Sequence, residues 1–245
     1  ARGARCVAVV GGRGGAGATT FATALALTAA RVAPTILLDL DPLGPGLDRV
    51  VGLDGDADQP GVRWDALTGS HGRLGSRSLR QALPHCDGLA VLTWGAGTPD
   101  AVDRGTAREV LSAAHRGHDV VVVDLPRYPD EAVDEVVARC DDVVVVAEAS
   151  VSAVAAAGRV VERLRALTGG LGAVVRAGPV PGDQVAGVLG IPLLAEVGHQ
   201  RRLAEHLDLG LGPVHSRRSP LARASRDTLA ALEARDPAVL RAAAS

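Results

Sequence analysis

The sequence contains no lysine, so all 26 of its Lys-plus-Arg cations are arginines. We attribute this to a coding bias of the source rather than to chemistry. The absence still excludes sites that need a lysine amine, such as the Tyr-x-x-x-Lys pair of one form of oxidoreductase. Aromatic residues are also scarce, with one Phe, one Tyr and two Trp. Because apolar residues make up 47% of the 245, we expect a core built from Val, Leu and Ala.

Long apolar runs are missing as well. No stretch approaches the ~18 apolar residues of a transmembrane helix, and no secretory signal is visible. The net charge of −2 gives the whole chain no basic excess of the kind that indicates nucleic-acid binding. Cys6, Cys86 and Cys140 are odd in number and lack metal-ligand spacing, which is typical of buried thiols in a reducing compartment. We therefore expect a cytoplasmic protein that reaches a membrane only through partners.

Short apolar strands alternate with helical segments along the chain. The strands are expected at residues 6–10, 35–39, 89–93, 119–124, 142–147, 173–176 and 192–197. The main helices are expected at 19–31, 103–115, 131–139, 151–167, 184–189, 201–207 and 221–234, with weaker ones at 63–67 and 79–83. The strands are apolar on both faces, which predicts an α/β fold, a doubly wound and mostly parallel sheet with helices on both faces.

No repeat and no linker long enough to divide the chain is present, so we expect a single domain over residues 1–245. The chain begins with Ala1 rather than Met, which leaves open that it is the C-terminal part of a longer protein.

A glycine-rich stretch, GGRGGAGATT at residues 11–20, lies between the first expected strand and the first helix. In this strand–loop–helix context, backbone N–H groups converge on a phosphate. The spacing from Gly12 to Thr19 is that of a Walker A loop, G-x-x-x-x-G-K-[ST], except that Ala18 stands at the lysine position.

Two other interpretations of the loop stay open. Gly12 to Gly17 also fits G-x-G-x-x-G, and Asp39 follows at about the distance of a ribose-binding acid, which would indicate a dinucleotide site. A turn without a ligand is the third interpretation, although five glycines in seven residues cost much chain entropy for a turn alone. Two features favour the phosphate loop. A second threonine, Thr20, follows Thr19, and Asp124 ends a strand of four valines.

Three motifs are expected to meet at one edge of the sheet. The glycine loop, the pair Asp39 and Asp41, and Asp124 each follow or end a predicted strand. In open α/β sheets, ligands bind beyond the carboxyl ends of the strands. We therefore expect these motifs to form one site.

These residues resemble motifs of the MinD/ParA superfamily of P-loop proteins. Residues 13–20 look like its deviant Walker A motif, K-G-G-x-x-K-[ST] in general form. Residues 36–42 look like its second motif, and residues 120–126 look like its Walker B motif and the switch that follows. The likeness spans nearly the whole chain. Within the superfamily, the chain most resembles the CpaE/TadZ-like branch, including actinobacterial septum-site-determining proteins.

The resemblance implies a role for each matching residue. Asp41 would position the attacking water, and Arg13, at the signature-lysine position, would reach the phosphates of a partner in a sandwich dimer. Mg²⁺ would be held directly or through water by Thr19, Asp39 and Asp124. The residues that would bind ATP or ADP are Gly12, Arg13, Gly14, Gly15, Ala16, Gly17, Ala18, Thr19 and Thr20.

Two departures from the family pattern weaken this site. Ala18 removes the lysine that cradles the β- and γ-phosphates, and an arginine bias cannot explain an alanine there. Loss of one charge-assisted hydrogen bond, ~1.5–3 kcal/mol, weakens binding roughly ten- to a hundredfold. Hydrolysis should suffer more, because charge develops on these oxygens in the transition state. Arg176 and Ala177 stand where the family often has an adenine-reading asparagine.

The first functional hypothesis is a positioning or regulatory protein with a degenerate site, weak ATP binding and feeble or absent hydrolysis. By resemblance it would act in septum-site determination or in localising a pilus or secretion apparatus, as a nucleotide-dependent or constitutive homodimer with protein partners of that machine. One alternative is an active, dimerising Walker-type ATPase in which Arg13 compensates for Ala18. A second is an NAD(P)-binding Rossmann oxidoreductase.

Nonspecific DNA binding is a further partner that the family suggests. The C-terminal region is locally basic, through Arg201, Arg202, Arg217, Arg218, Arg223 and Arg226. Interleaved acids such as Glu205 and Asp208 instead favour ordinary solvated helix faces.

Overall fold

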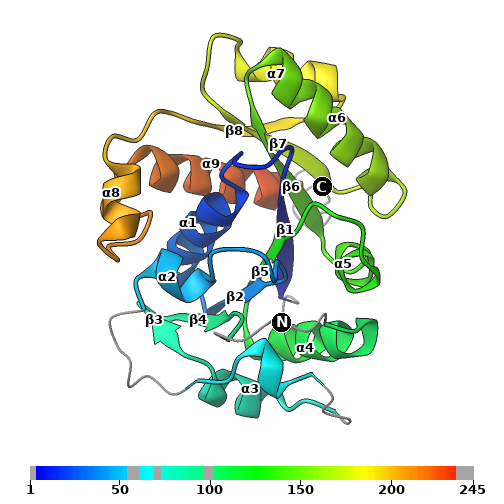
Figure 1. The fold of residues 1–245 in the computed structure, drawn as a ribbon, viewed down its shortest axis with the longest axis vertical. Helices are drawn as coiled ribbons and strands as arrows, with labels where there is room; N and C mark the ends of the chain where they lie inside the picture. The colour runs from blue at the N-terminus through cyan, green and yellow to red at the C-terminus, as the bar shows by residue number, and fades with distance from the viewer. Residues whose placement is uncertain (1–3, 54–60, 69–72, 96–101, 236–245) are drawn as a thin grey trace, which may run out of the picture.

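In the computed structural model, residues 4–53, 61–68, 73–95 and 102–235 are described, and their centre is an eight-stranded sheet (Figure 1). The strand order is β3-β4-β2-β5-β1-β6-β7-β8. All neighbouring strands are parallel except β3 and β4. The strands are β1 Arg5–Gly11, β2 Thr35–Asp39, β3 His85–Cys86, β4 Leu89–Leu92, β5 Val120–Leu125, β6 Asp142–Glu148, β7 Leu171–Arg176 and β8 Leu193–Val197.

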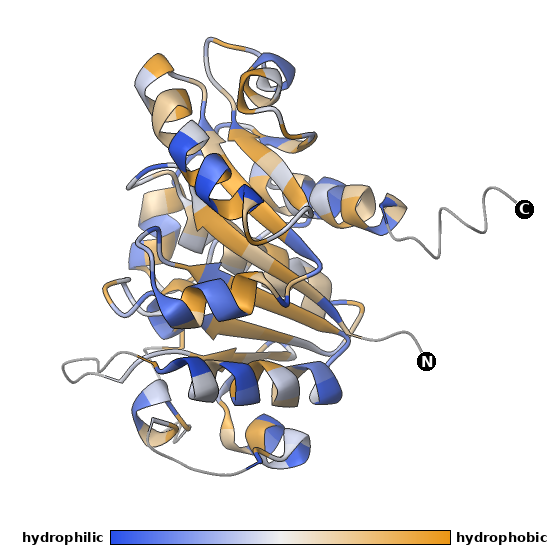
Figure 2. Cartoon of the chain, turned by 90° about the vertical axis from the view of Figure 1, so that its right-hand side faces the viewer, coloured by the Kyte–Doolittle hydropathy of each residue, from blue (hydrophilic) through white to orange (hydrophobic). Residues whose placement is uncertain are grey.

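Helices cover both faces of this sheet, as Figure 2 shows by the apolar strands enclosed between helical layers. On one face lie α1 Ala18–Ala30, α2 Leu47–Val51 and α9 Pro220–Ala234. The other face is covered by α3 Ser76–Ala82, α4 Arg104–Gly117, α5 Glu131–Val137, α6 Val151–Arg165 and α7 Gly182–Leu189. A short helix, α8 Leu203–Asp208, contacts α2. The predicted doubly wound α/β fold is confirmed.

Alternation along the strands divides the core into two layers. In β1, Cys6, Ala8 and Val10 face the α4–α7 side, whereas Val7 and Val9 face α1 and α9. Both sets are almost completely buried, which explains why the strand is a continuous apolar run rather than an alternating one. The core consists mainly of Val, Leu and Ala, as the composition predicts.

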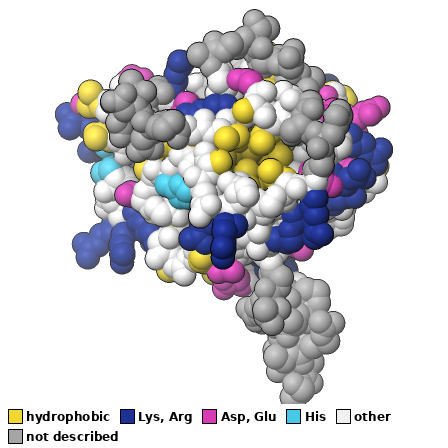
Figure 3. All heavy atoms as spheres, turned by 90° about the horizontal axis from the view of Figure 1, so that it is seen from below, with side chains coloured by type: hydrophobic (Ala, Val, Ile, Leu, Met, Phe, Trp, Pro, Cys, Tyr) yellow, Lys and Arg dark blue, Asp and Glu magenta, His cyan; other side chains and the backbone are white. Residues whose placement is uncertain are grey.

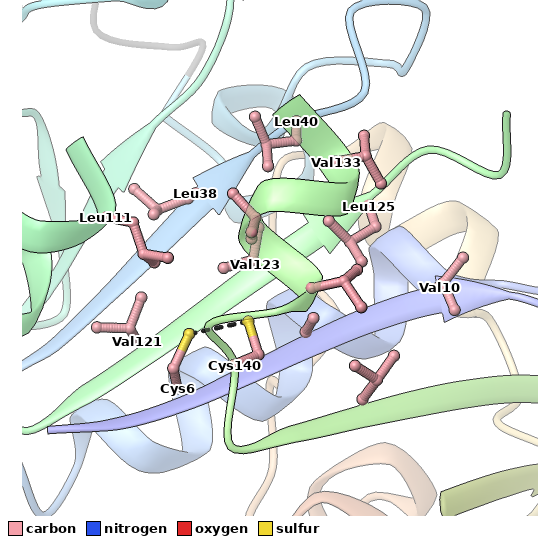
Figure 4. Packing of buried hydrophobic residues seen from close by; sticks show 14 of the residues in the cluster. Cys6, Val10, Leu38, Leu40, Leu111, Val121, Val123, Leu125, Val133 and Cys140 are labelled. Atoms are coloured by element: carbon pink, nitrogen blue, oxygen red, sulfur yellow. Dashed lines mark hydrogen bonds between the residues drawn. The ribbon is translucent and has the colours of Figure 1, made fainter. Parts of the chain in front are cut away.

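Two of the three thiols are buried in the α4–α7 layer, as expected. Figure 4 shows the sulfurs of Cys6 and Cys140 facing each other near Val121, and they are 3.1 Å apart. The hydrogen bond to Cys140 and burial raise the pKa of the Cys6 thiol well above its ordinary value. Cys86 lies near the edge of the sheet and is only partly buried.

The main differences from the sequence prediction lie at the β3 edge. Strand β3 is antiparallel to β4 and was not predicted, because two residues are too short to show a periodic pattern. The expected helix at 63–67 is a single 3₁₀ turn, Trp64–Ala66. Residues 54–60, which come after α2 in the chain, lie outside the described residues.

No helix in the described ranges has the length and apolar character needed to cross a lipid bilayer. The surface near α3 and α4, seen from below in Figure 3, carries arginines interspersed with acidic side chains.

Candidate functional site

The glycine loop joins β1 to α1, and its backbone geometry requires glycine at several positions. Gly15 and Gly17 have φ values of 75° and 89°, in the left-handed region that favours glycine. A Cβ atom on Gly12 would lie 2.6 Å from the Cβ of Ala157 in α6. The Gly12 N–H donates to the carbonyl oxygen of Val146 at 2.8 Å, which ties the start of the loop to β6.

The start of α1 is suited to binding an anion. Gly17 is the N-cap, no side chain of the described residues caps the helix, and its first turn contains no acidic residue. The first N–H groups of a helix lack intrahelical acceptors, and the helix dipole is positive at this end. The loop therefore directs backbone donors toward the position that a phosphate takes in a strand–loop–helix site.

Asp39 and Asp124 lie side by side at the carboxyl edge of the sheet. They are direct partners in the register of the parallel strands β2 and β5, and Val9 of β1 is paired with Asp124 on its other side. The two residues are only 2% and 1% exposed. The strand order β2-β5-β1 thus brings the three predicted motifs to one site, as expected.

Hydrogen bonds hold Asp39 in place at both of its carboxylate oxygens. Oδ1 accepts from the backbone N–H of Asp41 at 3.1 Å, and Oδ2 accepts from the hydroxyl of Thr93 at 2.7 Å. Burial is the largest cause that raises the pKa of Asp39, to about 7, while the two hydrogen bonds oppose the shift. The carboxyl group of Asp39 therefore changes its protonation state near neutral pH.

Asp124 has an unsatisfied oxygen. Its Oδ1 is buried and has no hydrogen-bond partner among the described residues, while Thr19 is a side-chain hydrogen-bond partner of the same carboxylate. Burial first, and then the charge of Asp39, raise the pKa of Asp124 well above its ordinary value. A cation at this position would relieve both the missing contact and the repulsion.

These oxygen groups fit Mg²⁺ bound together with a nucleotide. Mg²⁺ prefers oxygen ligands and is held by one or two carboxylates, water and substrate phosphates. Thr19, Asp39 and Asp124 supply a hydroxyl and two carboxylates. In the described ranges, no group of three or more His, Cys, Asp or Glu could hold a metal ion alone. Phosphate oxygens would therefore complete the coordination.

Asp41 lies just beyond β2 and is half-buried. Its Oδ1 accepts from the N–H of Leu43 at 3.1 Å. It lies near enough to Asp39 and Asp124 for its charge to contribute to raising the pKa of both. Tyr128, which follows β5, belongs to the same neighbourhood, because burial first and then Asp41 raise the pKa of its phenol.

The side chain of Arg13 contacts groups of its own chain. Its Nε lies 3.3 Å from Oε2 of Glu148, the last residue of β6, and donates to the carbonyl oxygen of Gly14 at 3.2 Å. The side chain is 44% exposed. Arg176, at the end of β7, contacts the other oxygen of Glu148 at 2.7 Å.

Sequence reasoning missed three groups at the site. Thr93 follows β4, Glu148 ends β6, and Arg127 follows β5, with its Nη2 3.6 Å from where a Cβ on Gly14 would lie. All three are at the carboxyl ends of strands, like the residues that were predicted. Their position at strand ends was a signal that the sequence offered. None of the three residues belongs to a known motif, so nothing marked them out from other residues at strand ends.

The strand order bears on the dinucleotide interpretation. In the classical dinucleotide-binding order the first two strands are neighbours, whereas here β5 separates β1 from β2. Asp39 is also engaged by Thr93 and Asp41 rather than free for a ribose. Both observations favour the phosphate loop over a Rossmann site.

No family model matches the sequence. The chain is similar to two curated relatives, the uncharacterized proteins Rv3660c and MT3760 of Mycobacterium tuberculosis, strains H37Rv and CDC 1551. Each is 44% identical over 230 residues, which cover 92% of this chain. The match spans 63% of the length of these relatives, so they are longer than this chain.

Solved structures with the same fold include MinD and ParA proteins. A ParA family ATPase from Chlorobium tepidum superposes with a TM-score of 0.79 at 16% identity, over 93% of this chain and 98% of that one. MinD from Pyrococcus horikoshii, complexed with Mg-ADP, gives 0.77 at 19% identity, over 97% and 98%. MinD from Aquifex aeolicus gives 0.75 at 20% identity, over 95% and 98%. The chain has the fold of the MinD/ParA P-loop NTPases.

Proposed function

We propose that this chain is a MinD/ParA-like positioning or regulatory protein with a degenerate nucleotide site. It binds ATP or ADP with Mg²⁺ weakly and hydrolyses ATP feebly or not at all. The observation that carries the proposal is the loop of residues 12–20, with its left-handed glycines, beside Oδ1 of Asp124, which has no hydrogen-bond partner among the described residues. The fold it shares with MinD and ParA structures supports this general role.

The residues of the loop would divide the work. Backbone N–H groups of residues 14–20 would bind the phosphates, while Thr19, Asp39 and Asp124 would hold Mg²⁺ directly or through water. The ion would neutralise phosphate charge. Asp41 is the residue that would orient an attacking water. Each of these groups is at the carboxyl edge of β1, β2 or β5.

The degenerate character follows from Ala18. This residue is the first of α1 and carries no charge toward the phosphates. Loss of a charge-assisted hydrogen bond of ~1.5–3 kcal/mol reduces affinity roughly ten- to a hundredfold. The cost to hydrolysis is larger, since charge on the phosphoryl oxygens grows toward the transition state. We therefore propose that the bound nucleotide mainly promotes assembly of the protein and is hydrolysed little.

The proposed assembly is a homodimer, nucleotide-dependent or constitutive. Arg13 stands at the position that reaches across such a dimer, and its contact with Glu148 would have to break for it to do so. One solved neighbour is a MinC:MinD complex from Aquifex aeolicus, which supports protein partners for this fold. The resemblance to the CpaE/TadZ-like branch supports a septum, pilus or secretion machine as the partner.

The place of this chain in the cell is also a proposal. We propose one MinD/ParA-like domain over residues 1–245, carried by a longer protein like its relatives. It would act in the cytoplasm and reach the membrane through partners. Nonspecific DNA binding is the weaker proposal, because at least one C-terminal arginine, Arg202, is ion-paired, to Glu205.

An active ATPase is the second candidate, because Thr19, Asp39, Asp41 and Asp124 are all present at the site. The deciding experiment measures ATP binding with and without Mg²⁺ and then phosphate release. Weak Mg²⁺-dependent binding with little release supports the degenerate site. Release at the rate of ordinary MinD-like ATPases would establish the second candidate. Binding of NAD(P) without ATP would contradict both.

A further inference from the structure

The loss of the lysine at Ala18 raises the question of which other cation lies near the loop. Arg176 is the strongest candidate. Its Nη1 is 3.4 Å from the carbonyl oxygen of Gly15, and its Cδ is 3.9 Å from the position of a Cβ on Gly17. The two glycines bracket the middle of the loop, so the guanidinium group lies against the loop itself.

The topology explains how a distant residue reaches the loop. In the strand order, β6 lies between β1 and β7, and Arg176 is the register partner of Glu148 at the end of β6. Figure 1 shows the loop between β1 and α1 close to the ends of β6 and β7. An arginine side chain is long enough to cross the end of one strand and reach the loop after the next.

Glu148 holds this guanidinium in place. Its Oε1 is 2.7 Å from Nη1 of Arg176, and its Oε2 is 3.3 Å from Nε of Arg13. One carboxylate therefore joins two guanidinium groups, and the trio carries one net positive charge. The Arg176 side chain is 49% exposed, so it can leave Glu148 for a ligand without unpacking the core.

A phosphate group would compete with Glu148 for the same donors. Arginine binds carboxylate and phosphate with the same planar pair of N–H groups. When the loop is empty, Glu148 satisfies Arg176; when phosphates occupy the loop, their greater charge can take its place. This exchange needs only a rotation of an exposed side chain.

We propose that Arg176 supplies, within one chain, the phosphate-binding charge that Ala18 lacks, and that Glu148 competes with phosphate for it. The inference rests on the nucleotide binding proposed above and deepens it. It differs from the expectation for this strand end, where the family often carries a base-reading residue. Arg176 instead binds the phosphates, and its contribution to nucleotide affinity grows with the number of phosphates.

The test measures dissociation constants of fluorescently labelled AMP, ADP and ATP with Mg²⁺ for the whole chain. Arg176→Ala should weaken ATP binding about tenfold, ADP binding less and AMP binding little, because one exposed charge-assisted contact is lost. Glu148→Gln should tighten ATP binding by about three- to tenfold, since the competing charge is gone. Arg176→Lys should retain part of the affinity.

The matched control is Arg163→Ala. Arg163 is also ion-paired, to Asp134 of α5, but it lies near the C-terminal end of α6. Because α6 follows the parallel strand β6, that end is at the opposite edge of the sheet. This variant should bind all three nucleotides like the wild type, and thermal unfolding of both variants reports whether either is misfolded.

A double variant separates the charge from the fold. Ala18→Lys restores the lysine in the loop, so it should compensate for Arg176→Ala in the combined variant. Equal ATP affinity of Arg176→Ala and Arg163→Ala, with measurable wild-type binding, would overturn the inference alone. Equal weakening of AMP and ATP would instead assign Arg176 to the base or sugar and also overturn it. No binding by the wild type and by Ala18→Lys would overturn the proposed function, and the inference with it.

Discussion

Asp39 and Asp124 are register partners on adjacent parallel strands, and both are almost fully buried. Two carboxylates so close in a low-dielectric environment cannot both remain ionised without cost. The pKa of Asp39 is raised to about 7, and that of Asp124 is raised well above its ordinary value. This pair is the physical centre of the proposed cation site, and it makes the stability of the protein depend on pH.

Without nucleotide or Mg²⁺, we expect the protein to lose stability as pH rises from about 4 to about 7. The folded state keeps protons on these carboxyls that the unfolded chain releases near pH 3.9, so the unfolded state binds fewer protons in this window. The free energy of unfolding therefore falls as pH rises, and the contribution of the pair is fully present only at the acidic end.

Thermal unfolding between pH 4.5 and 7.5 checks this prediction. Asp124→Asn should flatten the dependence, because the amide carries no charge to repel Asp39. Asp183→Asn, at an exposed position, is the control and should leave the slope unchanged. A wild-type slope that matches that of Asp124→Asn would contradict the assignment.

Thr93→Val should destabilise the protein by about 1–3 kcal/mol, because it removes a buried hydroxyl with two partners. That hydroxyl donates to Oδ2 of Asp39 at 2.7 Å and accepts from the N–H of Leu47 at 3.0 Å. The pKa of Asp39 should rise further, since the Thr93 hydrogen bond lowers it. Urea unfolding gives the stability change. Thr93→Ser keeps the hydroxyl and should lose less than half as much.

Gly12→Ala should destabilise the protein by about 1–3 kcal/mol, the usual cost of overpacking. Its Cβ would lie 2.6 Å from the Cβ of Ala157 and 3.3 Å from the carbonyl oxygen of Val146. Ala157→Gly should partly rescue the variant by removing the closer contact. For comparison, Gly158→Ala adds a Cβ with no atom of the described residues within 4 Å and should stabilise α6 by up to about 1 kcal/mol. Urea midpoints of the wild type, Gly12→Ala, the Gly12→Ala/Ala157→Gly double variant and Gly158→Ala test these expectations.

Ala18→Lys should raise ATP affinity roughly ten- to a hundredfold by restoring a charge-assisted contact at the start of α1. Isothermal titration with ATP and Mg²⁺ gives the affinity. The matched control is Ala166→Lys, at the exposed cap position after the C-terminal end of α6, which adds the same charge at the opposite edge of the sheet. If both variants bind ATP equally well, the loop is not a phosphate cradle.

Much of the fold could be predicted because short, local sequence patterns specify its strands and helices. The valine-rich strands and the glycine loop can be recognised from five to ten consecutive residues. The predicted positions of three strands agree with β1, β5 and β6. Helix ends differ by a few residues, since capping rather than periodicity sets them; α4 begins after its cap at Asp103. Strand β3 has two residues and offers no period to detect.

The sequence by itself determined that a glycine loop with Thr19 precedes a helix and that Asp39, Asp41 and Asp124 stand at strand ends. Those features are local, and parallel strands bring their carboxyl ends to one edge. Only the tertiary structure decided which charges surround the loop. The contact between Gly15 and Arg176 joins residues 161 positions apart, and it exists because β6 and β7 follow β1 in the order of the sheet. Strand order depends on packing across the whole chain, so a missing lysine can be read from the sequence while its proposed replacement cannot.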